Sequence, residues 1–380
     1  MIIVKLLFIL FSLIICWTAY QPRTSDEFTP SLTDSIAFTD EVFFQSTQLG
    51  LDVWPALHSS NVIELHNQDL LVSWFAGTRE GHTDVGLYTQ RFTHDTQTWD
   101  APFLVTNRQR TSVDLNRYIK KVGNAVITEI QDNHLMMIYV SVSVGGWATS
   151  QLNVMHSYDN GFSWNQAQRI VTTPFFNIST LVRAHPILNQ QNEIWLPAYY
   201  ELAQTSSQII KLDTDNNIHF IQGIKSPNEA LAPVLVIQDN HNIQVLQRPK
   251  PAGNIQVAQI NLNNSGIKVN DFQNPVFTNP NASIDVISIT QNLWLMAYNP
   301  LDLKRQALGL AISVDQGKTW MHKKWVEKRV TKPKSKKIEY SYPSLKMKKN
   351  GDIALSYTHN RKSIYLVEFN LAWLLSEDAS

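Results

Sequence analysis

The chain has 380 residues, 43% of them hydrophobic and 17% charged, so it can bury a large core and is neither disordered nor collagen-like. Lysine plus arginine equals aspartate plus glutamate, 32 against 32, which removes the basic excess that nucleic-acid binding normally requires. The single cysteine, Cys16, excludes a disulfide within the chain and a cysteine zinc site, and the sequence implies no metal and no organic cofactor.

The chain begins with an apolar segment. Residues 2–19 are apolar apart from Lys5 and two small polar residues, and a polar stretch follows, which is the layout of a secretory signal or an uncleaved membrane anchor. Trp17 stands where signal cleavage after Ala19 needs a small residue, which favours the anchor. We expect a hydrophobic helix over residues 1–20 that exports the protein and holds it at the membrane, facing the periplasm or cell exterior; a cleaved segment would leave it secreted. A linker over 21–35 follows.

From residue 36 onward, strand-like runs alternate with turn residues, and eleven tryptophans, twelve tyrosines and sixteen phenylalanines favour β-structure. The runs form five sets of four strands and a final set of three, near residues 61–105, 122–172, 181–222, 233–272, 284–326 and 341–369. A period of about fifty residues is typical of propellers. We therefore predict an all-β, six-bladed propeller over residues 36–380. Residues 36–45 are expected to supply the missing strand of the last blade and so close the ring.

Two octapeptides share the pattern Ser-x-Asp-x-Gly-x-x-Trp, one from Ser157 to Trp164 and one from Ser313 to Trp320. In such an Asp box the serine and aspartate bond the amides of their own turn, the glycine adopts positive φ, and the tryptophan packs between sheets. Asp95 with Trp99 resembles an incomplete third copy. We expect these turns to be structural and to lie at the rim opposite the ligand site.

The predicted topology places charged residues at the other rim. If the first strand of each blade runs down from that rim, the starts of the blades and the connections between second and third strands open there. The residues at these positions are His58, Arg183, Asp285, Tyr342, Arg79, Asp84, Glu201, Arg248, Arg305 and Arg361. A ring of arginines is costly to assemble unless it holds an anion, so we expect an anionic ligand, with rim ion pairs as the alternative for any one arginine.

Several segments together resemble one family. They are the two Asp boxes and residues 74–80, 143–150, 279–281 and 339–345. The chain is similar to bacterial members of the exo-α-sialidase (neuraminidase) superfamily with Asp-box, or BNR, repeats, over nearly its whole length after the apolar segment. The resemblance implies a six-bladed propeller in which an arginine triad binds the carboxylate of the sugar.

The resemblance also implies roles for the arginines. Arg248 and Arg305 match the second and third arginines of the triad. The first triad arginine opens an Arg-Ile-Pro motif in the family, whereas here that place holds His58-Ser59-Ser60. Two guanidinium groups can still bind a carboxylate, with His58 as a weaker or pH-dependent contact. The acid bound is then sialic acid, another nonulosonic acid or a uronic acid.

Catalytic roles follow from the same resemblance. Asp84 follows Arg79 at a spacing similar to that of the family's acid/base aspartate, and a general acid needs a raised pKa. Tyr342 resembles the nucleophilic tyrosine, with Tyr340 as the alternative if the strand register shifts by two. A phenol suits an anomeric carbon that bears a carboxylate because it approaches uncharged. It needs a neighbouring base, for which the candidates are Glu201, which we prefer, and Glu229.

These assignments predict an exported glycoside hydrolase that removes a terminal acidic sugar from sialoglycoconjugates or related acidic glycans with retention. Two alternatives remain open: a sialidase-like propeller that only binds glycans, and a hydrolase or lyase that acts on uronic-acid glycans. Residues 323–337 hold eight basic residues and one acidic, which we interpret as a solvated hairpin and linker in preference to a polyanion-binding patch.

Overall fold

The computed structural model describes residues 28, 38–50, 54–173, 177–202, 204–224, 226, 228–263, 266–270, 277–300, 302, 304–328 and 338–377. The predicted hydrophobic helix over residues 1–20 lies outside these ranges, and of the predicted linker only Phe28 falls within them. Within the described ranges, every helix is too short or too polar to cross a bilayer.

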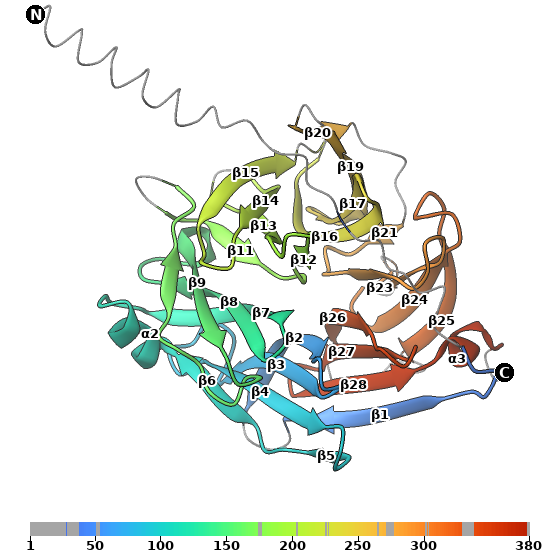
Figure 1. The fold of residues 1–380 in the computed structure, drawn as a ribbon, viewed down its shortest axis with the longest axis horizontal. Coiled ribbons are helices and arrows are strands. Elements are labelled where there is room, and N and C mark those ends of the chain that lie inside the picture. Colours follow the sequence, from blue (N-terminus) through green and yellow to red (C-terminus); the bar gives the residue numbers. More distant parts are fainter. Residues whose placement is uncertain are drawn as a thin grey trace, which may run out of the picture.

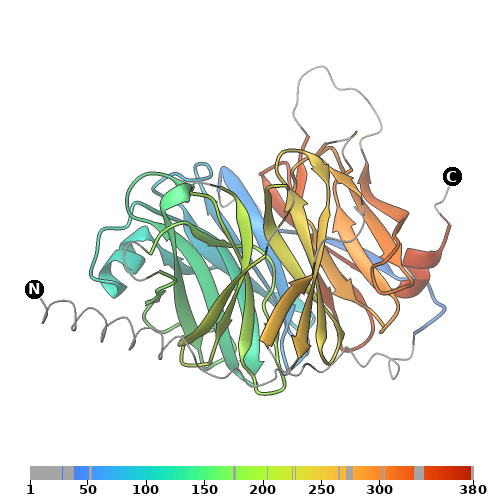
Figure 2. The same cartoon turned by 90° about the horizontal axis from the view of Figure 1, so that it is seen from above.

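Six antiparallel sheets surround a central axis as the blades of a propeller (Figures 1 and 2), which confirms the predicted fold class. The first blade contains β2 (Ala56–Glu64), β3 (Leu70–Gly77), β4 (Gly86–Thr93), β5 (Thr98–Trp99) and β6 (Phe103–Asn107). The second contains β7 (Lys121–Gln131), β8 (His134–Val142), β9 (Ser150–Ser157) and β10 (Gln168–Ile170). The third contains β11 (Thr180–Val182), β12 (Ile187–Leu188), β13 (Ile194–Tyr200), β14 (Ser206–Leu212) and β15 (Ile218–Ile224).

The remaining blades continue around the axis. The fourth contains β16 (Ala230–Asp239), β17 (Asn242–Pro249), β19 (Gln256–Asn263) and β20 (Gly266–Asn270). The fifth contains β22 (Asp285–Ser288), β23 (Trp294–Tyr298), β24 (Ala307–Ser313) and β25 (Met321–Lys328). The sixth contains β26 (Tyr340–Met347), β27 (Ile353–His359), β28 (Ser363–Phe369) and β1 (Phe44–Leu49). Outside the blades lie β18 (Gly253–Asn254), β21 (Thr278–Asn279), α2 (Arg108–Asp114), η2 (Trp147–Thr149) and α3 (Leu371–Leu375).

The two ends of the propeller chain close the ring. β1 pairs antiparallel with β28, from Phe44 opposite Phe369 to Leu49 opposite Ile364, and becomes the outer strand of the sixth blade. The predicted closure by an N-terminal strand is confirmed, although the strand begins at Phe44 and not at residue 36. The side chain of Asn370 accepts a hydrogen bond from the Phe43 amide, so the junction is also fixed beyond the strand itself.

Blades pack face to face, which is why some strands are apolar on both faces. All residues of β3 and β8 are buried, because each lies in the middle of a sheet that has neighbours on both sides. The tryptophans Trp74, Trp195 and Trp294 are at most 2% exposed and lie within the apolar clusters between blades. Burial of such large side chains supplies the main stabilisation of a chain that has no disulfide.

Both Asp boxes form the turns expected of them. In the first, the Ser157 hydroxyl accepts a hydrogen bond from the Gly161 amide at 2.7 Å, and Asp159 accepts one from the Ser163 amide at 2.9 Å. The second repeats this arrangement between Ser313 and Gly317 at 2.8 Å. Trp164 is 7% exposed and packs among residues of the first two blades. The boxes join β9 to β10 and β24 to β25, and their role is structural.

Four innermost strands carry a bulge near their first residues. The pairing register shifts in β2, β7, β16 and β26. The residues with positive φ inside these bulges are Ser59, Asn124, Ala232 and Tyr342. A bulge redirects a side chain out of the strand's alternation, and such strained backbone is common at functional sites. The bulges therefore mark one end of the propeller as distinct.

Replacement of Gly317 by alanine tests the packing of the second Asp box. Gly317 has a φ of +78°, and a Cβ atom there would collide with the Gln244 side chain and lie 2.7 Å from the Trp294 ring. We expect Gly317→Ala to lower the free energy of unfolding by about 2 kcal/mol, measured by urea denaturation. Gly146→Ala is the control, because no atom lies within 4 Å of the added Cβ. An equal loss in both variants would contradict this account of the turn.

Candidate active site

The mouth of the propeller is the end at which the bulged strands begin. In the second blade, Val142 pairs with both Lys121 and Ser150 at this end. At the other end, the amide of Asn160, in the Asp box, donates a hydrogen bond to the carbonyl of Asn133. The first strand of the blade therefore runs away from the mouth, and the Asp box lies opposite to it. This arrangement agrees with the topology predicted from the sequence.

Tyr342 lies at the centre of the mouth. It occupies the bulge of β26 with a φ of 56° and is half-buried. The His58 ring meets it edge to face with 4.4 Å between ring centroids. The guanidinium carbons of Arg183 and Arg305 lie 5.1 and 5.9 Å from the centroid of the tyrosine ring. Residues from β2, the end of β11, the β23–β24 connection and β26 thus meet around one phenol, as the sequence predicts.

Glu339 fixes two of the predicted arginines. Its carboxylate accepts a hydrogen bond from Arg305 Nη1 at 2.9 Å and from Arg361 Nε at 2.9 Å and Nη2 at 3.2 Å. Burial raises the pKa of this carboxyl, but the hydrogen bonds and charges of Arg361 and Arg305 outweigh it and lower the pKa to about 2. Glu339 is therefore ionised at neutral pH and balances part of the positive charge of the mouth.

Asn281 brings the two arginines of the predicted carboxylate site together. Its side-chain oxygen accepts a hydrogen bond from Arg248 Nε at 2.7 Å, and its backbone carbonyl accepts one from Arg305 Nη2 at 3.0 Å. Residues of the fourth and fifth blades thus converge on one asparagine between blades. Each guanidinium group keeps N–H groups that these hydrogen bonds do not use, and those groups can bind an anion.

Arg183 is the most deeply buried of the arginines, at 3% exposure. Its Nη2 donates to the Pro343 carbonyl at 2.7 Å, and its Nε has no partner among the described residues. Burial lowers its pKa, and the charge of Asp285 opposes that shift. A buried cation with an unpaired donor beside Tyr342 favours an anion in the mouth.

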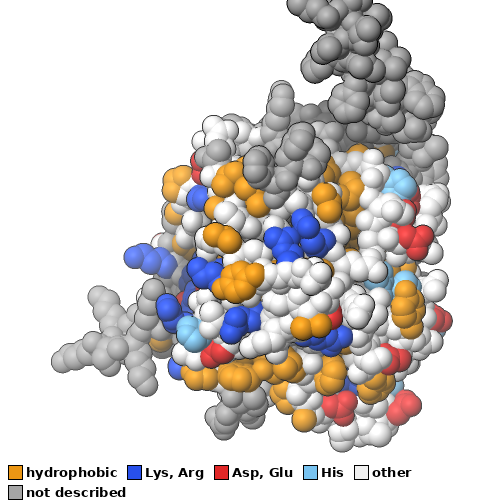
Figure 3. Space-filling view, turned by 90° about the vertical axis from the view of Figure 1, so that its left-hand side faces the viewer, with side chains coloured by type: hydrophobic (Ala, Val, Ile, Leu, Met, Phe, Trp, Pro, Cys, Tyr) orange, Lys and Arg blue, Asp and Glu red, His pale blue; other side chains and the backbone are white. Residues whose placement is uncertain are grey.

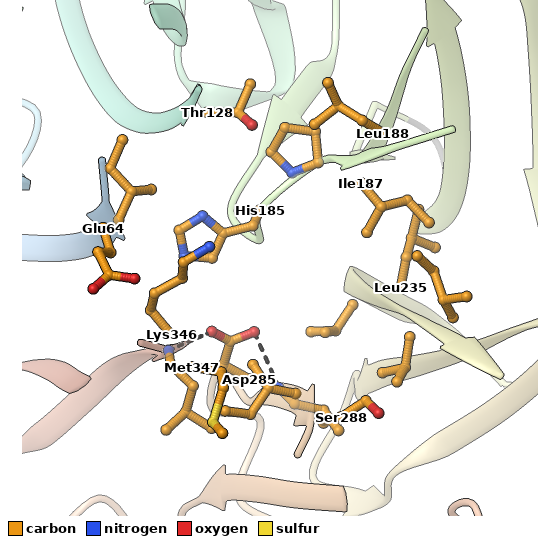
Figure 4. Close-up of a pocket in the computed structure, with 18 of the residues that line it drawn as sticks. Glu64, Thr128, His185, Ile187, Leu188, Leu235, Asp285, Ser288, Lys346 and Met347 are labelled. Carbon is orange, nitrogen blue, oxygen red and sulfur yellow. Dashed lines mark hydrogen bonds between the residues drawn. The ribbon is translucent and has the colours of Figure 1, made fainter. Parts of the chain in front are cut away.

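Asp285 lies behind the mouth and not at its surface. It is 4% exposed, burial raises its pKa to about 6, and its carboxylate accepts a hydrogen bond from the Leu345 amide at 2.7 Å. It borders an axial cavity of about 370 Å³. Asp285, Lys346, His185 and Glu64 lie along one side of this cavity, and aliphatic side chains such as Leu235 line the other (Figure 4). Asp285 therefore ties β22 to β26 beneath the ligand site.

His58 differs from the expectation of a pH-dependent contact. It is 2% exposed, and burial together with the charge of Arg361 lowers its pKa well below 6.5. The imidazole is therefore neutral throughout the physiological range and adds no charge to the carboxylate site. Its Nε2 lies 3.9 Å from the Glu80 carboxylate, which in turn pairs with Arg361 Nη1 at 2.6 Å.

A second hollow adjoins the tyrosine between the first two blades. It has a volume of about 520 Å³. Its polar and aromatic lining consists of His58, Arg79, Glu80, Lys121, Trp147 and Arg361, together with Phe75. His58, which lines this hollow, also contacts Tyr342, and Arg361, which lines it too, also pairs with Glu339, so the hollow shares two side chains with the site around Tyr342.

Asp84 does not have the raised pKa that a general acid requires. Burial raises its pKa, but the hydrogen bonds from Thr78 and His82 together outweigh burial and lower the pKa overall. The Thr78 hydroxyl lies 2.5 Å and His82 Nδ1 2.7 Å from the carboxylate, on the loop between β3 and β4. The expectation of a raised pKa was wrong because the same short loop that brings Asp84 to the mouth also supplies donors to its ionised form.

The two candidate bases differ in their surroundings. Glu201 follows β13. Burial raises the pKa of Tyr199, and the charges of Tyr342 and Glu201 raise it further. Glu229 is exposed and lines a separate pocket near Thr205. Of the described residues, none hydrogen-bonds the Tyr342 hydroxyl. Tyr340 packs against Tyr357 and His359 in the apolar cluster of the last two blades, so it does not share the environment of Tyr342.

Comparison with protein families identifies the chain. Residues 68–355, more than half of its length, match the BNR repeat-like domain. The chain belongs to the BNR repeat-like family. No curated protein matches its sequence.

Sialidases of known structure share the fold of this BNR repeat-like protein. The Hadza microbial sialidase is similar with a TM-score of 0.69 at 15% identity, over 84% of this chain and 66% of that one. The intramolecular trans-sialidase from Ruminococcus gnavus, solved with oseltamivir carboxylate, has a TM-score of 0.63 at 13% identity, over 84% of this chain and 96% of that one. The Trypanosoma rangeli sialidase in complex with the inhibitor DANA has a TM-score of 0.63 at 12% identity, over 84% of this chain and 56% of that one. The chain spans less than two thirds of the first and third proteins. At these identities the likeness establishes the fold.

Sequence reasoning missed several residues that the BNR repeat-like protein places at its mouth. They are Glu80, Lys121, Trp147, Tyr199, Asn281 and Glu339. Most of them lie inside the segments that carried the family resemblance, and Glu339 begins the strand segment that holds Tyr342. A signal was available in the charge pattern, because a mouth with several arginines requires a carboxylate close to them.

The variant Glu339→Gln tests the ion pairs that Glu339 forms with Arg305 and Arg361. A carboxyl whose pKa falls from 4.5 to about 2 on folding contributes stability fully above about pH 4.5 and loses that contribution as the pH falls towards 2. We expect the variant to lose about 2 kcal/mol of unfolding free energy at pH 7 and much less near pH 2.5, measured by urea denaturation at both values. Glu377→Gln, at an exposed glutamate, is the control. A loss of unfolding free energy that is the same at both pH values would contradict the role of Glu339 as an ionised partner of the arginines.

Proposed function

We propose that this BNR repeat-like protein is a sialidase-type exo-glycosidase that removes a terminal acidic sugar from glycoconjugates with retention. The observation that carries the proposal is the position of Tyr342 at the mouth, with its ring between His58 and the guanidinium groups of Arg183 and Arg305. A phenol among cations suits attack on a carbon that carries a carboxylate. The sialidase fold of the solved neighbours is consistent with it.

The carboxylate of the sugar is bound by Arg248 and Arg305 in this proposal. Asn281 holds both guanidinium groups, so their free N–H groups need little reorganisation when the ligand arrives. Arg183, whose guanidinium group lies over the ring of Tyr342, adds a third cation. Because His58 is neutral, it shapes the wall of the site instead of contributing charge.

Tyr342 is the nucleophile. Its oxygen bonds the anomeric carbon as the bond to the leaving oxygen breaks, and the nearby guanidinium groups stabilise the phenolate character of the attacking oxygen. Glu201 is the proposed base, and it takes the phenol proton as substrate binding brings the groups within reach of one another. This choice of base is supported by the buried position of Tyr199, whose pKa both Tyr342 and Glu201 raise. The exposed Glu229 has no comparable connection.

The leaving oxygen takes its proton from the pair formed by Asp84 and His82. Their side chains lie 2.7 Å apart on the loop between β3 and β4. Asp84 and His82 share one proton across this contact, and the pair passes it to the leaving oxygen. In the second step water attacks the anomeric carbon and gives its proton to this pair, and Tyr342 recovers its own proton from Glu201.

A glycan-binding propeller without catalysis is the second candidate. Two observations favour it: Asp84 is stabilised in its ionised form, and no described carboxylate hydrogen-bonds Tyr342. Such a protein would bind the same acidic sugars through the same arginines and release them unchanged.

The variant Tyr342→Phe distinguishes the two candidates. We expect the wild-type protein to hydrolyse fluorogenic sialosides or uronides and the variant to lose about a thousandfold in kcat, because the nucleophilic oxygen is removed. Tyr118→Phe, at a tyrosine that is 64% exposed, is the control and should keep full activity. Saturable binding by the wild type without turnover of any acidic glycoside would support the binding protein. Turnover of uronides alone would identify the acid as a uronic acid.

A further inference from the structure

Phe28 is the one residue of the predicted linker that the structure describes, and its side chain is fully buried. Its ring meets the Trp195 ring edge to face with 5.2 Å between the centroids. Both belong to an apolar cluster that joins the third blade, which contributes Trp195, to the fourth, which contributes Ile243. Burial of a phenylalanine fixes the backbone that carries it. The linker is therefore attached to the propeller at this point.

The contacts of Phe28 place it at the Asp-box end of the propeller. Its amide donates a hydrogen bond to the Asn240 carbonyl at 3.1 Å. Asn240 lies in the turn between β16 and β17, and β16 runs from Ala230 at the mouth to Asp239 at the opposite end. The ten residues of this strand span about 30 Å. The linker thus touches the propeller one full strand length away from the mouth.

The length of chain before Phe28 restricts where the apolar segment can lie. Eight residues, 20–27, separate Ala19 from Phe28. The nine steps between these two Cα atoms cover at most about 32 Å in a fully extended chain. A path to the mouth would have to cover the length of β16 and also pass around the outside of a blade, which is longer than this reach. The end of the apolar segment therefore lies nearer to the Asp-box end than to the mouth.

Charge separates along the same axis. In the space-filling side view, lysine and arginine side chains gather towards one half of the face and acidic ones towards the other (Figure 3). The exposed Lys120 lies at the mouth, next to the start of β7, whereas the exposed Asp132 and Asp215 lie in turns at the Asp-box end. Anionic lipids would therefore attract the mouth and repel the opposite end. The attachment at Phe28 opposes this electrostatic preference.

We propose that the Asp-box end of the propeller faces a lipid bilayer spanned by residues 2–19, and that Phe28 fixes this orientation by holding the linker between the third and fourth blades. A bilayer is the partner because residues 2–19 carry a single charge, on Lys5, and are long enough to span its apolar core. The mouth then opens away from the membrane. Acidic glycans consequently reach the mouth from solution or from another surface, a last step that rests on the proposed function.

The test places a dye at either end of the full chain in vesicles of phosphatidylcholine that contain a trace of acceptor-labelled lipid. Cys16→Ser removes the native thiol, and Lys318→Cys or Gly146→Cys supplies the labelling site. Lys318 is exposed in the second Asp box, and Gly146 is exposed at the mouth between β8 and β9. We expect energy transfer to the lipid to be about twofold more efficient from Lys318→Cys, because about 30 Å separates the two ends.

The variant Phe28→Ser tests the attachment itself. It should abolish most of the difference between the two dyes, because the linker is no longer held between the blades. Phe38→Ser is the matched control and should keep the difference, since this phenylalanine of the same region is 38% exposed. Addition of phosphatidylglycerol should bring the mouth of Phe28→Ser towards the lipid, whereas the chain with Phe28 keeps its orientation.

Equal transfer from the two dyes in the chain with Phe28, or stronger transfer from Gly146→Cys, would overturn the orientation. Failure of the full chain to float with the vesicles would overturn the bilayer as its partner. An unchanged difference in Phe28→Ser would reject Phe28 as the attachment, and if this variant does not fold, the two dyes in the chain with Phe28 still decide the orientation. None of these measurements depends on turnover, so they decide the inference even if no acidic glycoside is hydrolysed.

Discussion

The pairing of β1 with β28 is the constraint on which the propeller and its mouth depend. The sixth blade takes three strands from the end of the chain and its outer strand from residues 44–49. This blade also carries Tyr342, Glu339 and Arg361. A contact between the two ends of the chain therefore supports the centre of the site, although β1 itself contributes no residue to it. Loss of β1 would expose a sheet edge and loosen the strand that holds the phenol.

Several arginines lie close together at the mouth, and a few carboxylates balance part of their positive charge. Glu339 is shared by Arg305 and Arg361, and Glu80 engages Arg361 from the other side. Arg183 has only backbone and electrostatic partners around it, which leaves it available to an anion. Selective pairing divides the arginines into those that fix the architecture and those that meet a ligand. This division is the physical basis of the acidic-sugar site that we propose.

Periodicity and turn chemistry were sufficient to predict the fold, because every blade repeats the same local pattern and each Asp box has its own hydrogen bonds. The meeting of Tyr342 with His58, Arg183 and Arg305 also followed from the order of the strands. The partners of these residues could not be derived in this way. Asn281 and Glu339 act through contacts whose geometry depends on how two blades pack. The pKa of Asp84 depends on a loop conformation that spacing does not encode.

The bulges of the innermost strands affect which changes in strand length the mouth can accept. In a regular strand, inserting one residue sends every following side chain to the opposite face. In β2, β7, β16 and β26 the extra residue is absorbed near the mouth; the pairing beyond it is regular in β2 and β26, and β7 and β16 shift again only near their far ends. A bulge therefore confines a one-residue change in strand length to the mouth, and the middle of each strand keeps its core-facing alternation.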